Sequence, residues 1–183
     1  MQKIGFVLLL ILPALSYANS VRLVNASFLN QDGNTGYGLS YTGINNNFIT
    51  TLGYSNFSED NWRSSGFSAG LNYGFQSIDS GSVYFGLGVA SVKVSSSVGT
   101  VGPNNLNLSV EASDHHGFAR LGYTKLSGAG IDYDYSIISM DGETTYGAVW
   151  RGAINDDGLG WLFGISGNSD VDEIVSGGIS LIF

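Results

Sequence analysis

Residue types capable of acid–base or nucleophilic chemistry come closest together around the two histidines, in the run Asp114-His115-His116. A histidine beside a carboxylate or a serine can support general acid–base or nucleophilic catalysis, and Glu59, Asp60 and Ser113 are candidate partners. Adjacent residues of a strand point to opposite faces, so the two imidazoles cannot serve one substrate without a bulge. We therefore expect a polar loop boundary here and assign no catalytic residue. A hydrolase or acyltransferase built around His115 or His116 is the alternative.

Acidic residues are the other group that could bind a ligand. The densest cluster is Asp170-Val171-Asp172-Glu173, whose Asp170, Asp172 and Glu173 offer the oxygen ligands that a cation such as Ca²⁺ favours. The cluster lacks the spacing of an EF-hand loop, and a solvated acidic surface is the simpler interpretation. The chain has no Cys, which excludes a thiolate metal site and a disulfide. We expect neither a metal nor a cofactor.

The elements that must position these residues are strands. After residue 18, period-two alternation recurs along the chain and helical periodicity is almost absent. Phe67-Ala69-Leu71-Tyr73-Phe75 shows the pattern most clearly, with small and polar residues between the apolar ones. With a weaker run near Val21 to Leu29, the sequence predicts ten strands. Each has about 9 to 12 residues, the length that a tilted strand needs to cross a bilayer.

Turn residues predict how the strands pair. Asp32-Gly33 and Asp141-Gly142 are typical two-residue type I′ turns. The first turn places Phe28 opposite Tyr37. This register assigns Phe28 to the apolar face of the first strand, whose own alternation is weak. The second places Asp132 directly across from Arg151.

The N-terminus has the features of a secretory signal peptide. Lys3 precedes an almost wholly apolar run from Ile4 to Leu15, and Ser16-Tyr17-Ala18 ends in residues that a signal peptidase accepts. We expect cleavage near Ala18, with 1–18 as the signal and 19–183 as one domain. Six basic and fifteen acidic residues then remain, a net charge of about −9, which argues against nucleic acid as a partner.

Composition and loop spacing favour a barrel in a membrane. Charged residues make up 12% of the chain, about half of the ~25% usual for soluble domains. If the N-terminus is periplasmic, the short connections lie on the periplasmic side and the longest, Ser95 to Ser113, lies outside, as in outer-membrane barrels. A sheet can span hydrocarbon only when it closes, because unpaired backbone groups there cost several kcal/mol each. We predict an all-β, closed, antiparallel, up-and-down transmembrane barrel of ten strands, with eight strands as the alternative. A secreted β-sandwich is the rival fold.

Alternation also predicts which residues line the lumen. Small residues dominate the inward face, and glycines there could leave room for a channel. Charged side chains are expected to form a network across adjacent strands, because buried charges need partners. A charged constriction or a proton path is the alternative. The network residues are Arg120, Asp132, Asp134 and Arg151.

Two basic residues are expected near the outer rim, Arg63 and Lys93. Their side chains could bind phosphates of lipopolysaccharide. It is an equal alternative that both side chains are simply solvated charges at the rim and bind no phosphate.

The chain ends on Phe183, with Leu181 and Ile179 alternating before it. This ending resembles the C-terminal signal by which the barrel-assembly machinery recognises outer-membrane barrels. The set of strands resembles, in architecture alone, the small Gram-negative surface barrels of the opacity and attachment-invasion type, which usually have eight strands. The resemblance implies residence in the outer membrane among lipid and lipopolysaccharide, and a structural or adhesion-like role toward host or phage surface ligands. A narrow channel for small solutes is the alternative function, and no enzymatic activity is expected.

Overall fold

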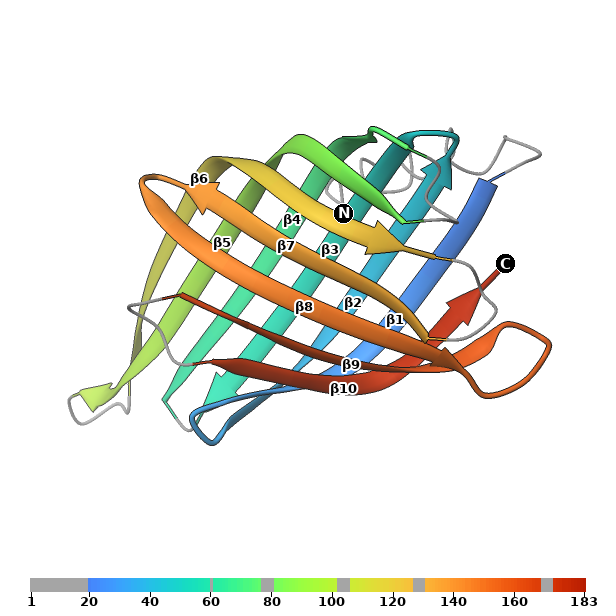
Figure 1. The fold of residues 1–183 in the computed structure, drawn as a ribbon. Helices are drawn as coiled ribbons and strands as arrows, with labels where there is room; N and C mark the ends of the chain where they lie inside the picture. The colour runs from blue at the N-terminus through green and yellow to red at the C-terminus, as the bar shows by residue number, and fades with distance from the viewer. Residues whose placement is uncertain (1–19, 60, 77–80, 102–105, 127–130, 169–172) are drawn as a thin grey trace.

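The protein folds as a closed β-barrel of ten antiparallel strands (Figure 1). The computed structural model describes residues 20–59, 61–76, 81–101, 106–126, 131–168 and 173–183. Each strand pairs with its neighbours in sequence, and β1 pairs with β10 to close the barrel. The predicted up-and-down barrel is therefore confirmed with ten strands rather than eight, and the β-sandwich is wrong. The strands are β1 (Ser20–Gln31), β2 (Asn34–Asn45), β3 (Phe48–Glu59), β4 (Trp62–Gly74), β5 (Ser82–Val101), β6 (Leu106–Lys125), β7 (Ile131–Met140), β8 (Glu143–Ala153), β9 (Leu159–Gly167) and β10 (Ile174–Ile182).

The two predicted turns determine the strand register as expected. Asp32 has φ of 48° and Gly33 of 83°, and the turn after β7 has φ of 51° at Asp141 and 86° at Gly142. These positive values are what a type I′ turn requires at both central residues. Phe28 lies opposite Tyr37, as predicted.

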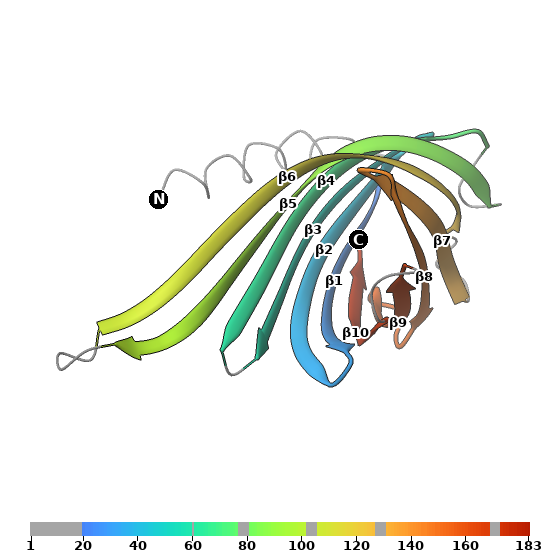
Figure 2. The same ribbon diagram turned by 90° about the vertical axis from the view of Figure 1, so that its left-hand side faces the viewer.

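One predicted loop is wrong. The segment from Ser95 to Ser113, expected to be a long external loop, mostly continues β5 and β6, which are 20 residues each. The β5–β6 hairpin therefore extends beyond the other strands (Figure 2). This part of β5 contains the β-branched residues Val98, Thr100 and Val101 after three serines, and β-branched residues favour extended backbone. Because the segment is rich in polar residues, its sequence resembles a loop, and the preference for a strand is not evident from it.

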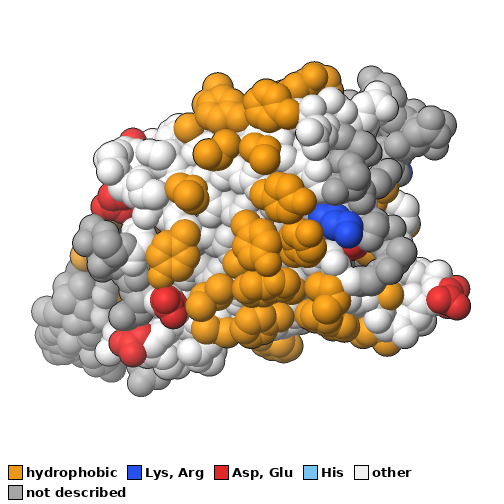
Figure 3. Space-filling view, viewed as in Figure 1, with side chains coloured by type: hydrophobic (Ala, Val, Ile, Leu, Met, Phe, Trp, Pro, Cys, Tyr) orange, Lys and Arg blue, Asp and Glu red, His pale blue; other side chains and the backbone are white. Residues whose placement is uncertain are grey.

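The distribution of apolar and polar side chains between the outside and the inside of the barrel is the reverse of that in a water-soluble protein. Every strand carries at least one large hydrophobic residue on the exposed outer face, such as Phe28, Leu71 and Leu87. Polar side chains are instead buried in the interior, among them Asn72 and Asp132. In the space-filling view, apolar side chains spread over the middle of the wall and acidic ones lie toward its two ends (Figure 3). No helix among the described residues is long and apolar enough to cross a membrane.

Rings gather on the outer face at the end of the barrel where β1 begins and β10 ends. Tyr123 stacks on Tyr133 with ring centroids 5.9 Å apart, and Trp150 stacks on Phe163 at the same distance. Tyr135 links the two pairs, because its hydroxyl accepts a hydrogen bond of 3.1 Å from Trp150 Nε1. Together these side chains form an aromatic row from β6 to β9.

Candidate functional site in the barrel lumen

Two of the four predicted lumenal charges form an ion pair. Arg120 on β6 and Asp134 on β7 lie on adjacent strands, and Arg120 Nη2 is 2.9 Å from Asp134 Oδ1. The same nitrogen donates to Ser136 Oγ at 3.2 Å. Tyr84 from β5 donates its hydroxyl to the Asp134 carboxylate at 3.1 Å. The Arg120 guanidinium also lies 5.4 Å from the Tyr84 ring centroid, within the range of a cation–π contact. Asp134 therefore links three consecutive strands, β5, β6 and β7, on the inner face of the barrel.

The other two predicted charges lie one step nearer the end of the barrel where β1 begins and β10 ends. Asp132 on β7 is the cross-strand partner of Arg151 on β8, as the turn chemistry predicts. Their exposed fractions are 3% and 9%. The carboxylates of Asp134 and Asp132 both attract the Arg151 guanidinium. Of the four predicted charges, Arg120, Asp134 and Arg151 line the same lumenal cavity, and Asp132 is buried beside it on β7.

Below this charged layer, the lumen contains a packed apolar cluster that the sequence analysis missed. Leu23, Ile44, Ile49 and Leu126 come from β1, β2, β3 and the end of β6, and they pack around Tyr84. None of the five is more than 6% exposed. We call this cluster the apolar floor. Small residues were expected to dominate the inward face, and at this end large apolar side chains lie there as well. The signal in the sequence was the set of apolar residues at inward positions near strand ends.

The inward glycines do not leave an open channel at the levels where large side chains cross the lumen. A Cβ atom added to Gly122 would collide with the Tyr84 ring, and one added to Gly88 would collide with the Phe118 ring. The glycines therefore provide space that neighbouring aromatic side chains occupy. This packing explains how so narrow a barrel holds tyrosine and phenylalanine inside.

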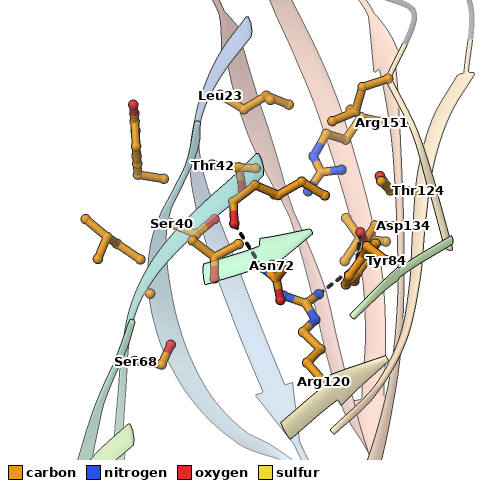
Figure 4. A pocket seen from close by; sticks show the side chains of 17 residues that line it. Leu23, Ser40, Thr42, Ser68, Asn72, Tyr84, Arg120, Thr124, Asp134 and Arg151 are labelled. Atoms are coloured by element: carbon orange, nitrogen blue, oxygen red, sulfur yellow. Dashed lines mark hydrogen bonds and ion pairs between the residues drawn. The ribbon is translucent and has the colours of Figure 1, made fainter. Parts of the chain in front are cut away.

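Above the floor, the polar side chains enclose a cavity of about 220 Å³ (Figure 4). Arg120 and Arg151 enter it from opposite ends of the view, with Asn72 between them (Figure 4). Asn72 is 2% exposed, and its Nδ2 donates to the Ile49 carbonyl at 3.1 Å. The remaining lining includes Ser40, Thr42, Thr51, Ser68, Thr124 and Asp134.

Three polar atoms of this cavity are buried without a hydrogen-bond partner among the described residues. They are Asn72 Oδ1, Arg120 Nε and Arg151 Nε. Each of these atoms is covered by neighbouring protein atoms rather than open to the cavity. A second chamber of about 350 Å³ shares Ser40 and Ser68 with the cavity and continues toward the end that carries the long hairpin.

The two histidines lie at that hairpin end, outside the polar cavity. His115 and His116 pair regularly with Ser91 and Ala90, so their side chains point to opposite faces. His116 Nδ1 contacts the carboxylate of Asp141, and its Nε2 is 3.4 Å from Asp114 Oδ2. The acidic partner thus comes from the β7–β8 turn. Asp60, a candidate partner by sequence, lies outside the described residues.

Among the other predicted site residues, the C-terminal ones take part in closing the barrel. Phe183 exchanges two backbone hydrogen bonds of 3.0 Å with Arg22 on β1. Ile179 and Leu181 pair with β1 and expose 56% and 44% of their surface on the outer face.

The cation cluster is described only in part. Asp170 and Asp172 lie outside the described residues. Glu173 accepts a hydrogen bond of 3.1 Å from the Tyr146 hydroxyl.

The two rim cations differ in their surroundings. Lys93 forms an ion pair with Glu111 on the adjacent strand. Arg63 is exposed and lines an outer groove together with Asn61, Trp62 and several serines.

Comparison with known proteins adds a likeness of architecture. No protein-family model and no curated protein matches the chain. Among solved structures, it is similar to the N-terminal β-barrel domain of OprF from Pseudomonas aeruginosa, with 11% identity, coverage of 90% of this chain and 98% of the other, and a TM-score of 0.48. It is also similar to the KdgM porin, with 11% identity, coverage of 88% and 99%, and a TM-score of 0.49. The attachment invasion locus protein Ail of Yersinia pestis matches with 15% identity, coverage of 90% and 97%, and a TM-score of 0.39.

Proposed function

We propose that the chain is an integral outer-membrane β-barrel that does not conduct solutes and that presents the β5–β6 hairpin at the cell surface. The observation that supports membrane residence is the continuous apolar exterior, to which all ten strands contribute. Exposed apolar patches on soluble proteins are local and rarely exceed a few hundred Å². An apolar surface on every strand of a closed sheet, with polar groups inside, suits a hydrocarbon solvent.

The outer face also supports an orientation with the hairpin end outward. Tyr54 and Phe67 are paired on the outer face, and the next outward pair toward the hairpin end is Asn56 and Ser65. Lys93 of β5 pairs with Ser65 of β4. It therefore lies at the level where the outward side chains change from aromatic to polar. Basic side chains at that level are suited to contact the phosphates of lipopolysaccharide, the lipid partner of this proposal. The start of β1, the end of β10 and the aromatic row then lie at the periplasmic side.

The apolar floor supports the absence of conduction. A solute crossing the barrel would have to displace Leu23, Ile44 and Ile49, whose exposed fractions are 0%, 6% and 4%. The ion pair between Arg120 and Asp134, on the adjacent strands β6 and β7, adds further side-chain volume inside the barrel. These two layers favour a closed barrel over the channel alternative. The role that we propose is structural and surface-interacting, without catalysis. In this role the long hairpin contacts host or phage surface ligands.

Single-cysteine labelling tests membrane residence and orientation. Because the chain has no native Cys, Ser109→Cys on β6 and Asp156→Cys at the β8–β9 turn each create a unique site. We expect a membrane-impermeant maleimide to label Ser109→Cys on intact cells and Asp156→Cys only after the outer membrane is permeabilised. Equal labelling of both variants on intact cells would contradict the orientation. Recovery of the protein in the soluble fraction would contradict membrane residence.

Conductance in planar bilayers tests the closed lumen. We expect the unmodified protein to be silent and the double variant Leu23→Ala, Ile49→Ala to conduct ions, because it removes side chains from the floor. Leu39→Ala with Leu71→Ala is the matched control, since both residues are more than half exposed on the outer face. Steady ion conductance by the unmodified protein would refute the proposal.

A further inference from the structure

We propose that the cavity above the apolar floor binds a small, uncharged, polyhydroxylated molecule of about monosaccharide size, which enters from the hairpin end. This inference goes beyond the proposed surface role and does not depend on the function of the hairpin.

The size of the cavity exceeds the needs of isolated waters. Its volume is about 220 Å³, and the share of liquid volume per water molecule is about 30 Å³. The space therefore corresponds to roughly seven waters or to one small organic molecule. Well-packed barrels of this width fill such space with side chains, as Tyr84 does beside Gly122.

The polar side chains that line the cavity define the chemistry of the ligand. Arg120 and Arg151 carry hydrogen-bond donors, and Asp134 carries acceptors. Arg151 and Asn72 are 9% and 2% exposed, so bulk water has little access to this lining. A ligand must therefore supply acceptors and a donor within one small volume. Hydroxyl groups do both, and the surrounding Ser and Thr hydroxyls can adapt to either role.

The charge balance of the cavity argues for an uncharged ligand. Arg120 is neutralised by Asp134 at 2.9 Å, and Arg151 is flanked by Asp132 and Asp134. A carboxylate or phosphate bound here would leave an uncompensated charge in an enclosed space, which is costly. An ammonium ion would meet the two guanidinium groups. A neutral polyol meets neither penalty.

Access is available from one side. The second chamber, which shares Ser40 and Ser68 with the cavity, is lined by small residues such as Ser27, Gly38 and Gly66. The apolar floor lies on the opposite side, with Leu23 and its neighbours. The cavity is thus a cup that is reached from the hairpin end.

The test observes the arginines directly. The chain has four, Arg22, Arg63, Arg120 and Arg151, so ¹⁵N-arginine labelling of the full chain in detergent micelles should give four Nε–Hε signals by NMR. With D-glucose as the probe, we expect saturable shifts of the Arg120 and Arg151 signals and no shift of the other two. Sodium acetate and sodium phosphate serve as charged probes.

Each outcome decides the proposal. Saturable shifts with glucose alone support it. Saturation with acetate or phosphate and not with glucose would overturn the uncharged class of ligand, and no saturation with any probe would mean that the cavity holds water only. Ser68→Leu, which narrows the passage, should weaken glucose binding at least tenfold, whereas the outward Ser65→Leu should not. If Ser68→Leu fails to fold, the titration of the unmodified protein still decides.

Discussion

Replacement of Asp134 by Asn should destabilise the barrel strongly, because it leaves the Arg120 guanidinium buried without its counter-charge. Asn keeps the size of the side chain and an oxygen that can accept from the Tyr84 hydroxyl, so the change isolates the charge. The Arg120 and Asp134 side chains are 19% and 17% exposed, and their closest atoms are 2.9 Å apart.

The magnitude follows from this geometry. Removing one partner of a buried ion pair destabilises proteins by about 3–5 kcal/mol. The partial exposure of both side chains, together with the remaining carboxylate of Asp132, places the expected loss near the lower limit. We expect about 3 kcal/mol, which corresponds to a change of about a hundredfold in the unfolding equilibrium.

The assay is urea unfolding in lipid vesicles, followed by tryptophan fluorescence and by the shift between boiled and unboiled protein on a gel. Asp156→Asn, an exposed acid at the β8–β9 turn, is the control and should change the free energy of unfolding by less than about 0.5 kcal/mol. The double variant Arg120→Met, Asp134→Asn should recover much of the loss, because it removes both charges. If Asp134→Asn behaves as the control does, the pair is not a buried counter-charge and the reasoning is wrong.

Two further predictions concern glycines. Gly122→Val should prevent formation of the heat-modifiable folded band, because its side chain would collide with the Tyr84 ring and the Tyr135 carbonyl, whereas Gly177→Val should fold, since no atom lies within 4 Å of an added Cβ there. Equal folding yields of the two variants on a gel would contradict the filled lumen. Gly142→Val, at φ of 86°, should lower the free energy of unfolding by about 1–2 kcal/mol, and an unchanged urea midpoint would refute the required left-handed turn.

Strand positions and register can be read from the sequence because they depend on local chemistry. Alternation reports which residues share a face, and Asp-Gly pairs adopt the positive φ values that type I′ turns need. For that reason the sequence alone places Asp132 opposite Arg151, and the barrel has the same pairing. The β5–β6 hairpin resembles a loop in the sequence for an equally local reason, since serine-rich segments show little strand character until their pairing partner is present.

The contents of the lumen required the closed barrel. Leu23 and Leu126 are far apart in the sequence, and their contact depends on the curvature that brings the ends of β1 and β6 across the lumen. The same holds for His116, whose partner Asp141 belongs to a turn between two other strands.

The sequence by itself therefore determined the class of fold, the number of strands, their register and the inward direction of Arg120, Asp132, Asp134 and Arg151. Each depends on neighbours along the chain or across one hairpin. Only the tertiary structure decided that an apolar floor packs inside the lumen and that a polar cavity remains above it. The physical reason is that side-chain volume inside a barrel is shared by strands from the whole circumference, so whether space is filled or left open depends on all of them together.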